Sequence, residues 1–417
     1  MARTPIADVI WQTIGQPAVA VRGYDGSAAG PADAQVTVDL RTPAALSYLI
    51  TAPGSLGLAR AYISGQMEIT GDLYDLLVAL WSGGIEPLSW GDRLGVLRNL
   101  DPKALRWVDP PAEEFRARRL RHGFRHSKAR DAAAISHHYD VSNAFYEWVL
   151  GPSMTYTCAC YPTEPATLEE AQFHKYDLVA KKLDLKPGMR LLDVGCGWGG
   201  MVRHAATHYG VEALGVTLSR KQAEWAAKAI AEDGMTGVAE VRFCDYRDVT
   251  ESGFDAVSSI GLTEHIGLAQ LPSYFSFLHG KLRPQGRMLN HSITRPTTTE
   301  EVKTTGFIDR YVFPDGELEG VGAIVSAMQN SGFEVRHEEN LREHYGRTLH
   351  GWCDNLTEHW DEAVAEVGEG RAKVWALYMA GSRLGFERRF IELHQVLGVR
   401  VDDHGDAGMP ARPDWGV

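Results

Sequence analysis

A cluster of glycines marks one turn of the chain as a ligand site. Residues 193–200 read DVGCGWGG, directly after the apolar run 189–192 and before a helix-like segment. Glycine has no side chain, so it lets the backbone bend sharply and approach a ligand closely. Gly195, Gly197 and Gly200 also satisfy the dinucleotide fingerprint GxGxxG. The turn therefore predicts a nucleotide-type ligand at the end of a strand.

Two details of this turn argue against a dinucleotide. Asp193 leads it, where a negative charge would repel a pyrophosphate. A dinucleotide site also needs an acidic residue about 20 positions further on for the ribose, but residues 217–219 read TLS. The form D-x-G-x-G-x-G instead resembles motif I of class I S-adenosylmethionine (SAM) methyltransferases.

The elements around the turn alternate between strand and helix patterns. Short apolar runs at 189–197, 211–219, 241–249, 254–262 and 286–293 are separated by helix-like segments such as 199–210. This alternation predicts an α/β fold with a doubly wound, mainly parallel sheet, and ligands at the carboxyl ends of its strands.

The part before the turn is different in character. Helix-like runs between Ala44 and Gln66 are broken at Pro53-Gly54, and residues 72–81 predict a short amphipathic helix. Consecutive prolines at 110 and 111 suit a linker. We expect a smaller, largely helical N-terminal domain (1–110), a basic linker (111–135) and a catalytic domain (136–417).

Composition narrows the function classes. The 417 residues carry 42 Lys and Arg against 54 Asp and Glu, a net charge of −12, which argues against general nucleic-acid binding. Five cysteines are too few for a disulfide scaffold, so reduced thiols in the cytoplasm fit best. No apolar run reaches the roughly 18–20 residues of a membrane span, and the N-terminus lacks a signal peptide. We expect any membrane contact to be peripheral.

One basic segment stands out in this acidic chain. It spans residues 116–130 and holds Arg116, Arg118, Arg119, Arg121, Arg125, Lys128 and Arg130. It is either a solvated helix face or a contact with anionic lipid, where each cation contributes about 1 kcal/mol. The residues alone leave both interpretations open.

Further motifs follow one another in a fixed order. They are HYDVSNAFY (138–146), LGPSMTYTCA (150–159), GVTLSRKQ (215–222), SIGLTEHIG (259–267), RYVFPDGEL (310–318) and EHYGRTLHGW (343–352). Together with the glycine turn, they resemble the cyclopropane-fatty-acyl-phospholipid synthases and mycolic acid cyclopropane synthases from about His137 to about Val396. The N-terminal part is only loosely similar to that of the phospholipid-acting members, which favours a phospholipid substrate.

The resemblance implies a reaction. Its members add a carbon from the SAM methyl group to a cis double bond of an acyl chain, and a bound bicarbonate ion deprotonates the resulting carbocation. The residues implied to hold the bicarbonate are Cys158, Glu264, His291, the backbone of Ile293, and Tyr345. A buried oxyanion needs such donors, and Glu264 would orient the ion and receive its proton. Without the resemblance, Cys158 reads as a small buried hydrophobe, Glu264 with His265 as a surface pair, and His291 as a core histidine.

The resemblance also implies a SAM site and no metal. The implied residues are Tyr156, Thr157, Asp193, Gly195, Gly197, Gly199, Thr217, Leu218, Gln222, Asp245, Tyr246 and Arg247. Gln222 can hydrogen-bond the ribose in place of the missing acid, and residues 245–247 stand where adenine is usually held.

Two products remain open. Loss of a proton from the bridging carbon closes a cyclopropane ring, whereas a hydride shift before proton loss leaves an exocyclic methylene. Thr263 and the C-terminal tail favour the actinobacterial branch that makes 10-methylene chains, which a flavin-dependent reductase partner then reduces. A methyltransferase for a small soluble acceptor and a non-catalytic lipid-binding subunit are the rival functions. We expect a homo-oligomer that acts on unsaturated phospholipid acyl chains at the membrane surface.

Overall fold

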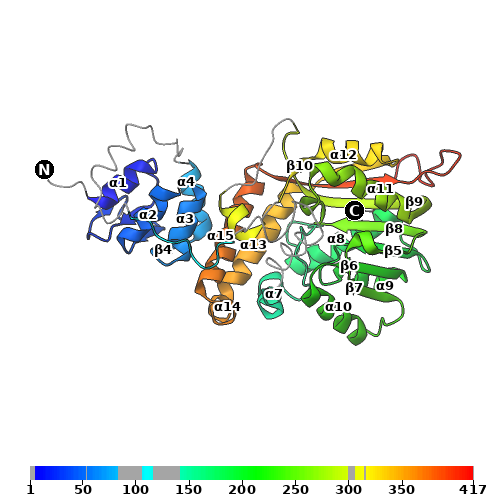
Figure 1. Cartoon of the computed structure of the whole chain (residues 1–417), viewed down its shortest axis with the longest axis horizontal. Coiled ribbons are helices and arrows are strands. Elements are labelled where there is room, and N and C mark those ends of the chain that lie inside the picture. Colours follow the sequence, from blue (N-terminus) through cyan, green and yellow to red (C-terminus); the bar gives the residue numbers. More distant parts are fainter. Residues whose placement is uncertain are drawn as a thin grey trace. The chain divides into compact units, whose positions relative to one another are not determined.

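The computed structural model describes residues 5–52, 54–82, 106–115, 141–298, 306–313 and 316–416, which form two compact units (Figure 1). The smaller unit takes its described residues from 1–117, 305–314 and 360–384, and the larger unit from the rest. Residues 360–384 thus group with the N-terminal part, although they follow most of the predicted catalytic domain in sequence. The predicted linker falls largely on residues 116–140, which lie outside the described residues, so the boundaries at 110 and 135 stay predictions.

The smaller unit combines helices with a small sheet. Its helices are α1 (Ile6–Thr13), α2 (Pro43–Thr51), α3 (Ser55–Ile63), α4 (Leu73–Ser82), α14 (Trp360–Val367) and most of α15 (Glu369–Glu387). Its sheet has the order β2-β1-β3-β4, from β1 (Ala20–Arg22), β2 (Ala28–Ala29), β3 (Thr37–Leu40) and β4 (Met67–Thr70). The predicted helix at 72–81 is confirmed as α4, whose first turn is capped by Asp72, because its Oδ1 accepts from the Asp75 N–H at 3.0 Å. The sequence did not predict the sheet.

The larger unit is built on one twisted sheet, as predicted. Its strand order is β11-β12-β9-β8-β5-β6-β7, and β10 pairs with β9 beside this path. The strands are β5 (Arg190–Val194), β6 (Glu212–Thr217), β7 (Ala239–Phe243), β8 (Phe254–Ile260), β9 (Leu282–Arg295), β10 (Glu319–Gly320), β11 (Glu334–Asn340) and β12 (Glu392–Val399). β12 runs antiparallel to both of its neighbours, β9 and β11, and the other paired strands of this list are parallel. Because the order reverses between β5 and β8, a ligand crevice is expected there.

Helices cover both faces of this sheet, and alternate strand residues point to opposite faces. The helices are α7 (Asn143–Leu150), α8 (Leu168–Leu183), α9 (Gly200–Tyr209), α10 (Arg220–Glu232), α11 (Leu271–Lys281), α12 (Val321–Asn330) and α13 (Arg342–Glu358). Leu192 and Met288 pack in a buried cluster with α11 and α12, whereas Leu191 and Leu289 pack in another with α8 and α9. Of the helices in the described ranges, none is both long and apolar enough to cross a membrane.

Candidate functional site

A cavity opens at the carboxyl ends of β5, β6 and β8, at the point where the strand order reverses. Val194, Thr217 and Ile260 close these strands and line it. Its remaining walls are Met154, Thr155, Tyr156, Thr157, Lys175, Tyr176, Asp193, Gly195, Cys196, Gly197, Trp198, Gly200, Met201, Val216, Leu218, Gln222, Cys244, Tyr246, Gly261, Leu262 and His265. The cavity therefore lies where the glycine turn predicted a ligand.

Gly195, Gly197 and Gly199 serve different purposes in the turn. All three have positive φ, and a Cβ on Gly195 would lie 3.0 Å from the Leu262 Cβ, while one on Gly199 would lie 3.2 Å from the Ala226 Cβ. Around Gly197 no atom of the described residues lies within 4 Å of such a Cβ, although the residue lines the cavity. Gly195 and Gly199 thus allow close packing, and Gly197 leaves room for a ligand.

Asp193 places a carboxyl group in the wall of the cavity. The residue is buried on β5, and its Oδ1 accepts a hydrogen bond from the Ser258 hydroxyl of β8 at 2.6 Å. Burial raises the pKa of Asp193 to about 6, so the group is mostly ionised at neutral pH. A buried carboxylate at this point favours a cationic ligand over a phosphate.

The turn after β6 prepares Gln222 for a polar ligand. The Ser219 hydroxyl caps α10 by accepting from the Gln222 N–H at 3.2 Å. The Thr217 hydroxyl donates to the Gln222 Oε1 at 2.8 Å. Because Oε1 is engaged, the amide Nε2 is the group that Gln222 can offer to a ligand in the cavity.

Some predicted cofactor residues do not line this cavity. They are Gly199, Asp245 and Arg247. The Asp245 carboxylate accepts from Arg247 Nε at 2.7 Å and from Nη2 at 2.6 Å, so the two charges pair with each other. In this segment Cys244 and Tyr246 line the cavity, and the Tyr246 ring packs edge-on against Tyr274.

Lys175 is a cavity residue that the sequence reasoning missed. It is fully buried on α8, where its Nζ donates to the Thr157 hydroxyl at 3.1 Å and lies 3.6 Å from the centre of the Tyr176 ring. Burial lowers the pKa of Lys175 to about 7. Its signal in the sequence is spacing, because Ala171, Lys175 and Leu178 share one buried helix face.

A second group of polar side chains begins with Glu264, whose carboxyl group is enclosed. Its Oε1 accepts from the backbone N–H of Ile293 at 2.6 Å. Its Oε2 is buried and has no hydrogen-bond partner among the described residues. Burial raises the pKa of Glu264 to about 7, so the group can gain or lose a proton near neutral pH. Glu264 is therefore not part of a surface pair.

His291 lies on β9 two residues before Ile293, so its side chain is on the same face of the strand as that of Ile293. It is only 1% exposed, and its Nδ1 lies 3.1 Å from the Gln395 Nε2. Its Nε2 is buried without a partner in the part of the chain that the structure describes. Burial, and then the charges of Lys175 and Lys182, hold the pKa of His291 well below its usual value, so the ring is neutral.

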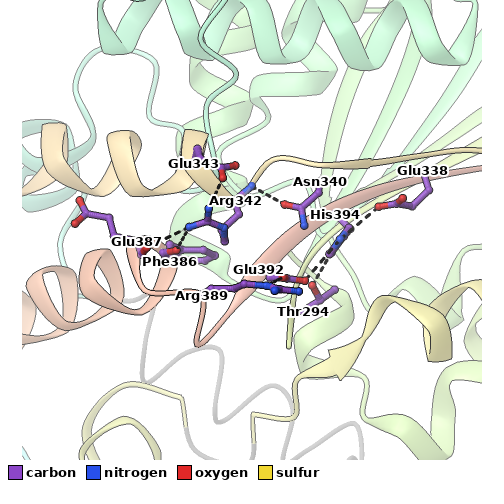
Figure 2. Close-up of polar contacts among 10 residues, drawn as sticks. All are labelled: Thr294, Glu338, Asn340, Arg342, Glu343, Phe386, Glu387, Arg389, Glu392 and His394. Atoms are coloured by element: carbon purple, nitrogen blue, oxygen red, sulfur yellow. Dashed lines mark hydrogen bonds and ion pairs between the residues drawn. The ribbon is translucent and has the colours of Figure 1, made fainter. Parts of the chain in front are cut away.

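Cys158 and Tyr345, the other two side chains predicted for this site, come from two other segments. The Cys158 thiol is fully buried, which holds its pKa well above the usual value, and its Sγ lies 3.8 Å from the Leu341 carbonyl. The Tyr345 ring stacks on Phe386 with centroids 4.4 Å apart. Arg342 in turn holds Phe386 in place, because its Nη1 donates to the Phe386 carbonyl at 2.6 Å (Figure 2).

Residues of this group are close in sequence to residues that line the cavity. Cys158 follows the lining residue Thr157, and Glu264 stands between the lining residues Leu262 and His265. The Gly261 N–H, also in the cavity wall, donates to the His291 carbonyl at 2.8 Å. None of the five predicted bicarbonate residues lines the cavity, but Glu264 and His291 are joined to its wall by these links.

Comparison with known proteins identifies the family of the chain. The model for mycolic acid cyclopropane synthetase matches residues 126–396. The chain belongs to this family. The family consists of SAM-dependent methyltransferases, so the predicted family, fold class and enzyme class are confirmed.

Relatives of the mycolic acid cyclopropane synthetase family extend this match. A probable fatty acid methyltransferase, Rv3720 of Mycobacterium tuberculosis, is 54% identical over 97% of this chain and 96% of its own. The cyclopropane-fatty-acyl-phospholipid synthase of Escherichia coli is 29% identical over 96% of both chains. Among solved structures, mycolic acid cyclopropane synthase CmaA1 complexed with SAH and CTAB superposes with a TM-score of 0.61 at 32% identity, covering 64% of this chain and 98% of that one.

Proposed function

We propose that this methyltransferase transfers the SAM methyl group to a cis double bond of an oleoyl-type phospholipid acyl chain and forms a methylene-branched chain. The observation that carries the proposal is the buried pair formed by Glu264 and His291 beside the cavity. The Glu264 Oε2 and the His291 Nε2 are both enclosed and both lack partners among the described residues. Native proteins seldom leave such atoms unsatisfied, so the pair is expected to receive a polar group.

The residues of this pair suit bicarbonate. A neutral imidazole N–H can donate to one oxygen of the ion, and a carboxylate can accept from its O–H. When bound, bicarbonate supplies a base for the removal of a proton from the methylated chain. Glu264, with its pKa raised to about 7, is suited to hold a proton at Oε2. Cys158 and Tyr345 stay predicted members of this site.

The cavity residues account for the first half of the reaction. Asp193 provides a negative charge beside the cavity in which we place the cationic cofactor, and Gln222 offers an amide donor for its ribose. As the alkene attacks, a new C–C bond forms while the bond from the methyl carbon to sulfur breaks, so SAH leaves and the cation remains on the acyl chain. A hydride shift then moves the cation to the methylated carbon, and loss of a proton from the added methyl gives the methylene.

Two features support this substrate and product. The relative named fatty acid methyltransferase is far more similar to this chain than the relative named cyclopropane synthase, at 54% against 29% identity. Both match the N-terminal part, whereas CmaA1, named for mycolic acid, covers only 64% of the chain. A methylene product would also give a flavin-dependent reductase partner its substrate.

We expect a host rich in oleoyl phospholipids to accumulate methylene-branched chains when it expresses this protein alone. Mass spectrometry of its lipids, with ozonolysis to locate an exocyclic double bond, is the measurement. Cells expressing the Glu264→Gln variant provide the matched control. Detection of a cyclopropane ring would show that the protein makes the alternative product. Unmodified lipids would contradict the proposal.

Attachment to anionic membranes through residues 116–130 belongs to the same proposal and rests on sequence alone, since that segment lies outside the described residues. Neutralising Arg118, Arg119 and Arg121 together should weaken vesicle binding by at most about 3 kcal/mol, because each charge near the lipid contributes about 1 kcal/mol. Co-sedimentation with anionic and zwitterionic vesicles at low and high salt measures this. If vesicle binding does not depend on lipid charge, on salt or on the triple substitution, the alternative interpretation of the segment as a solvated helix face is favoured.

A further inference from the structure

A row of polar side chains crosses three strands beneath α8. In the register of the sheet, Gln395 of β12 stands directly opposite His291 of β9 on one side and Glu339 of β11 on the other. Lys182 of α8 completes the row, because its Nζ donates to the Gln395 Oε1 at 2.7 Å and pairs with the Glu339 carboxylate. The side chains of Lys182, Gln395 and His291 are at most 1% exposed.

The direction of hydrogen bonding along this row follows from chemistry. A lysine side chain has no acceptor, so the Gln395 Oε1 must face Lys182. The Gln395 Nε2 is then a donor, and it faces the His291 Nδ1 at 3.1 Å. Nδ1 must therefore accept. In a neutral ring this leaves the proton on Nε2, which is the nitrogen without a partner among the described residues.

We infer that Lys182 and Gln395 are positioning residues that lock His291 in the Nε2-protonated tautomer, so that its N–H is presented to the anion. The inference rests on the proposed function for the identity of that anion. Glu339 secures the far end of the row by pairing with Lys182. Were Lys182 absent, the Gln395 amide would be free to turn, and its oxygen would then stabilise the opposite tautomer, which offers a lone pair to the anion.

The next residue along β12 provides a matched control. Side chains alternate between the faces of a strand, so His394 points away from this row. Figure 2 shows its separate network, in which Nδ1 lies 2.7 Å from the Thr294 hydroxyl and Nε2 lies 3.4 Å from the Glu338 carboxylate. His394 is also buried, at 4% exposure. Its loss should therefore disturb the strand without changing His291.

The test combines a spectroscopic and a kinetic measurement on the full-length protein. Nitrogen-15 chemical shifts of labelled histidines, with His291 assigned by its loss in His291→Asn, report which ring nitrogen carries the proton. Sodium bicarbonate is then titrated into carbonate-depleted enzyme with SAM and oleoyl phospholipid vesicles. The variants are Lys182→Met, Lys182→Arg, Gln395→Met and the control His394→Leu.

We expect an Nε2-protonated His291 in the wild type and in Lys182→Arg, and a mixture of tautomers in Lys182→Met and Gln395→Met. The bicarbonate KM should rise about tenfold or more in the last two, in line with the loss of a hydrogen bond to a charged group, while SAM affinity is kept. His394→Leu should change neither. An Nδ1-protonated ring in the wild type, or a bicarbonate KM that Lys182→Met leaves unchanged, would overturn the inference. If wild-type turnover ignores bicarbonate, the proposed function fails instead, and the nitrogen shifts still decide the tautomer.

Discussion

Glu264→Gln is expected to lower kcat by about 10²–10⁴-fold, the usual contribution of a positioned acid or base. Gln keeps an oxygen for the Ile293 N–H but cannot take up a proton at the position of the buried Oε2. The carboxyl acts after SAM is bound, so SAM affinity should change by less than about threefold. Single-turnover kinetics and titration calorimetry measure the two effects. Wild-type turnover in the variant would remove Glu264 from the mechanism.

A stability measurement separates this loss from misfolding. Burial raises the pKa of Glu264 in the folded protein from 4.5 to about 7. Between these values the unfolded chain ionises first, so the wild type loses stability as pH rises, by about 3 kcal/mol at pH 8. Glutamine has no such penalty. The variant should therefore unfold at no lower a temperature than the wild type at pH 8, and a clearly lower Tm would attribute its inactivity to the fold.

Gly197→Leu is expected to abolish measurable SAM binding. Gly197 lines the cavity at φ +55°, and no atom of the described residues lies within 4 Å of a Cβ placed there. A leucine would occupy the space that the ligand needs, besides costing about 1–2 kcal/mol for its left-handed backbone.

Gly234→Leu is the matched control for this backbone cost. Gly234 has φ +71° and equally open surroundings, but it is exposed after α10 and does not line the cavity. The control should lose similar stability and bind SAM normally in calorimetry. If Gly197→Leu also binds SAM normally, the glycine turn is not the cofactor site.

Local patterns predicted the elements that position the site. The apolar runs became β5, β6 and β8, and the glycine turn lies at their carboxyl ends, because buried parallel strands and positive-φ glycines leave strong signals. The short strands β1 and β2 left no such signal, since three and two residues carry no periodicity. Pairing across the chain was equally hidden, as in the hydrogen bond from the Ser258 hydroxyl of β8 to the Asp193 carboxyl of β5.

The two buried lysines of α8 are a sequence signal for a buried polar network. Lys175 and Lys182 stand seven residues apart on the apolar face of α8, where charges are rarely tolerated without partners. Their spacing therefore signals a buried polar network. The partners of Lys182 come from β11 and β12, more than 150 residues further along, so only the folded sheet identifies them.

The central claim is that one carbon from SAM is added to an unsaturated acyl chain and that this carbon then loses a proton. The most direct measurement supplies the purified protein with oleoyl phospholipid vesicles and SAM carrying a fully deuterated methyl group. We predict that mass spectrometry finds acyl chains that have gained one carbon bearing two of the three deuterium atoms. Chains that retain all three, or that gain no carbon, would contradict the account.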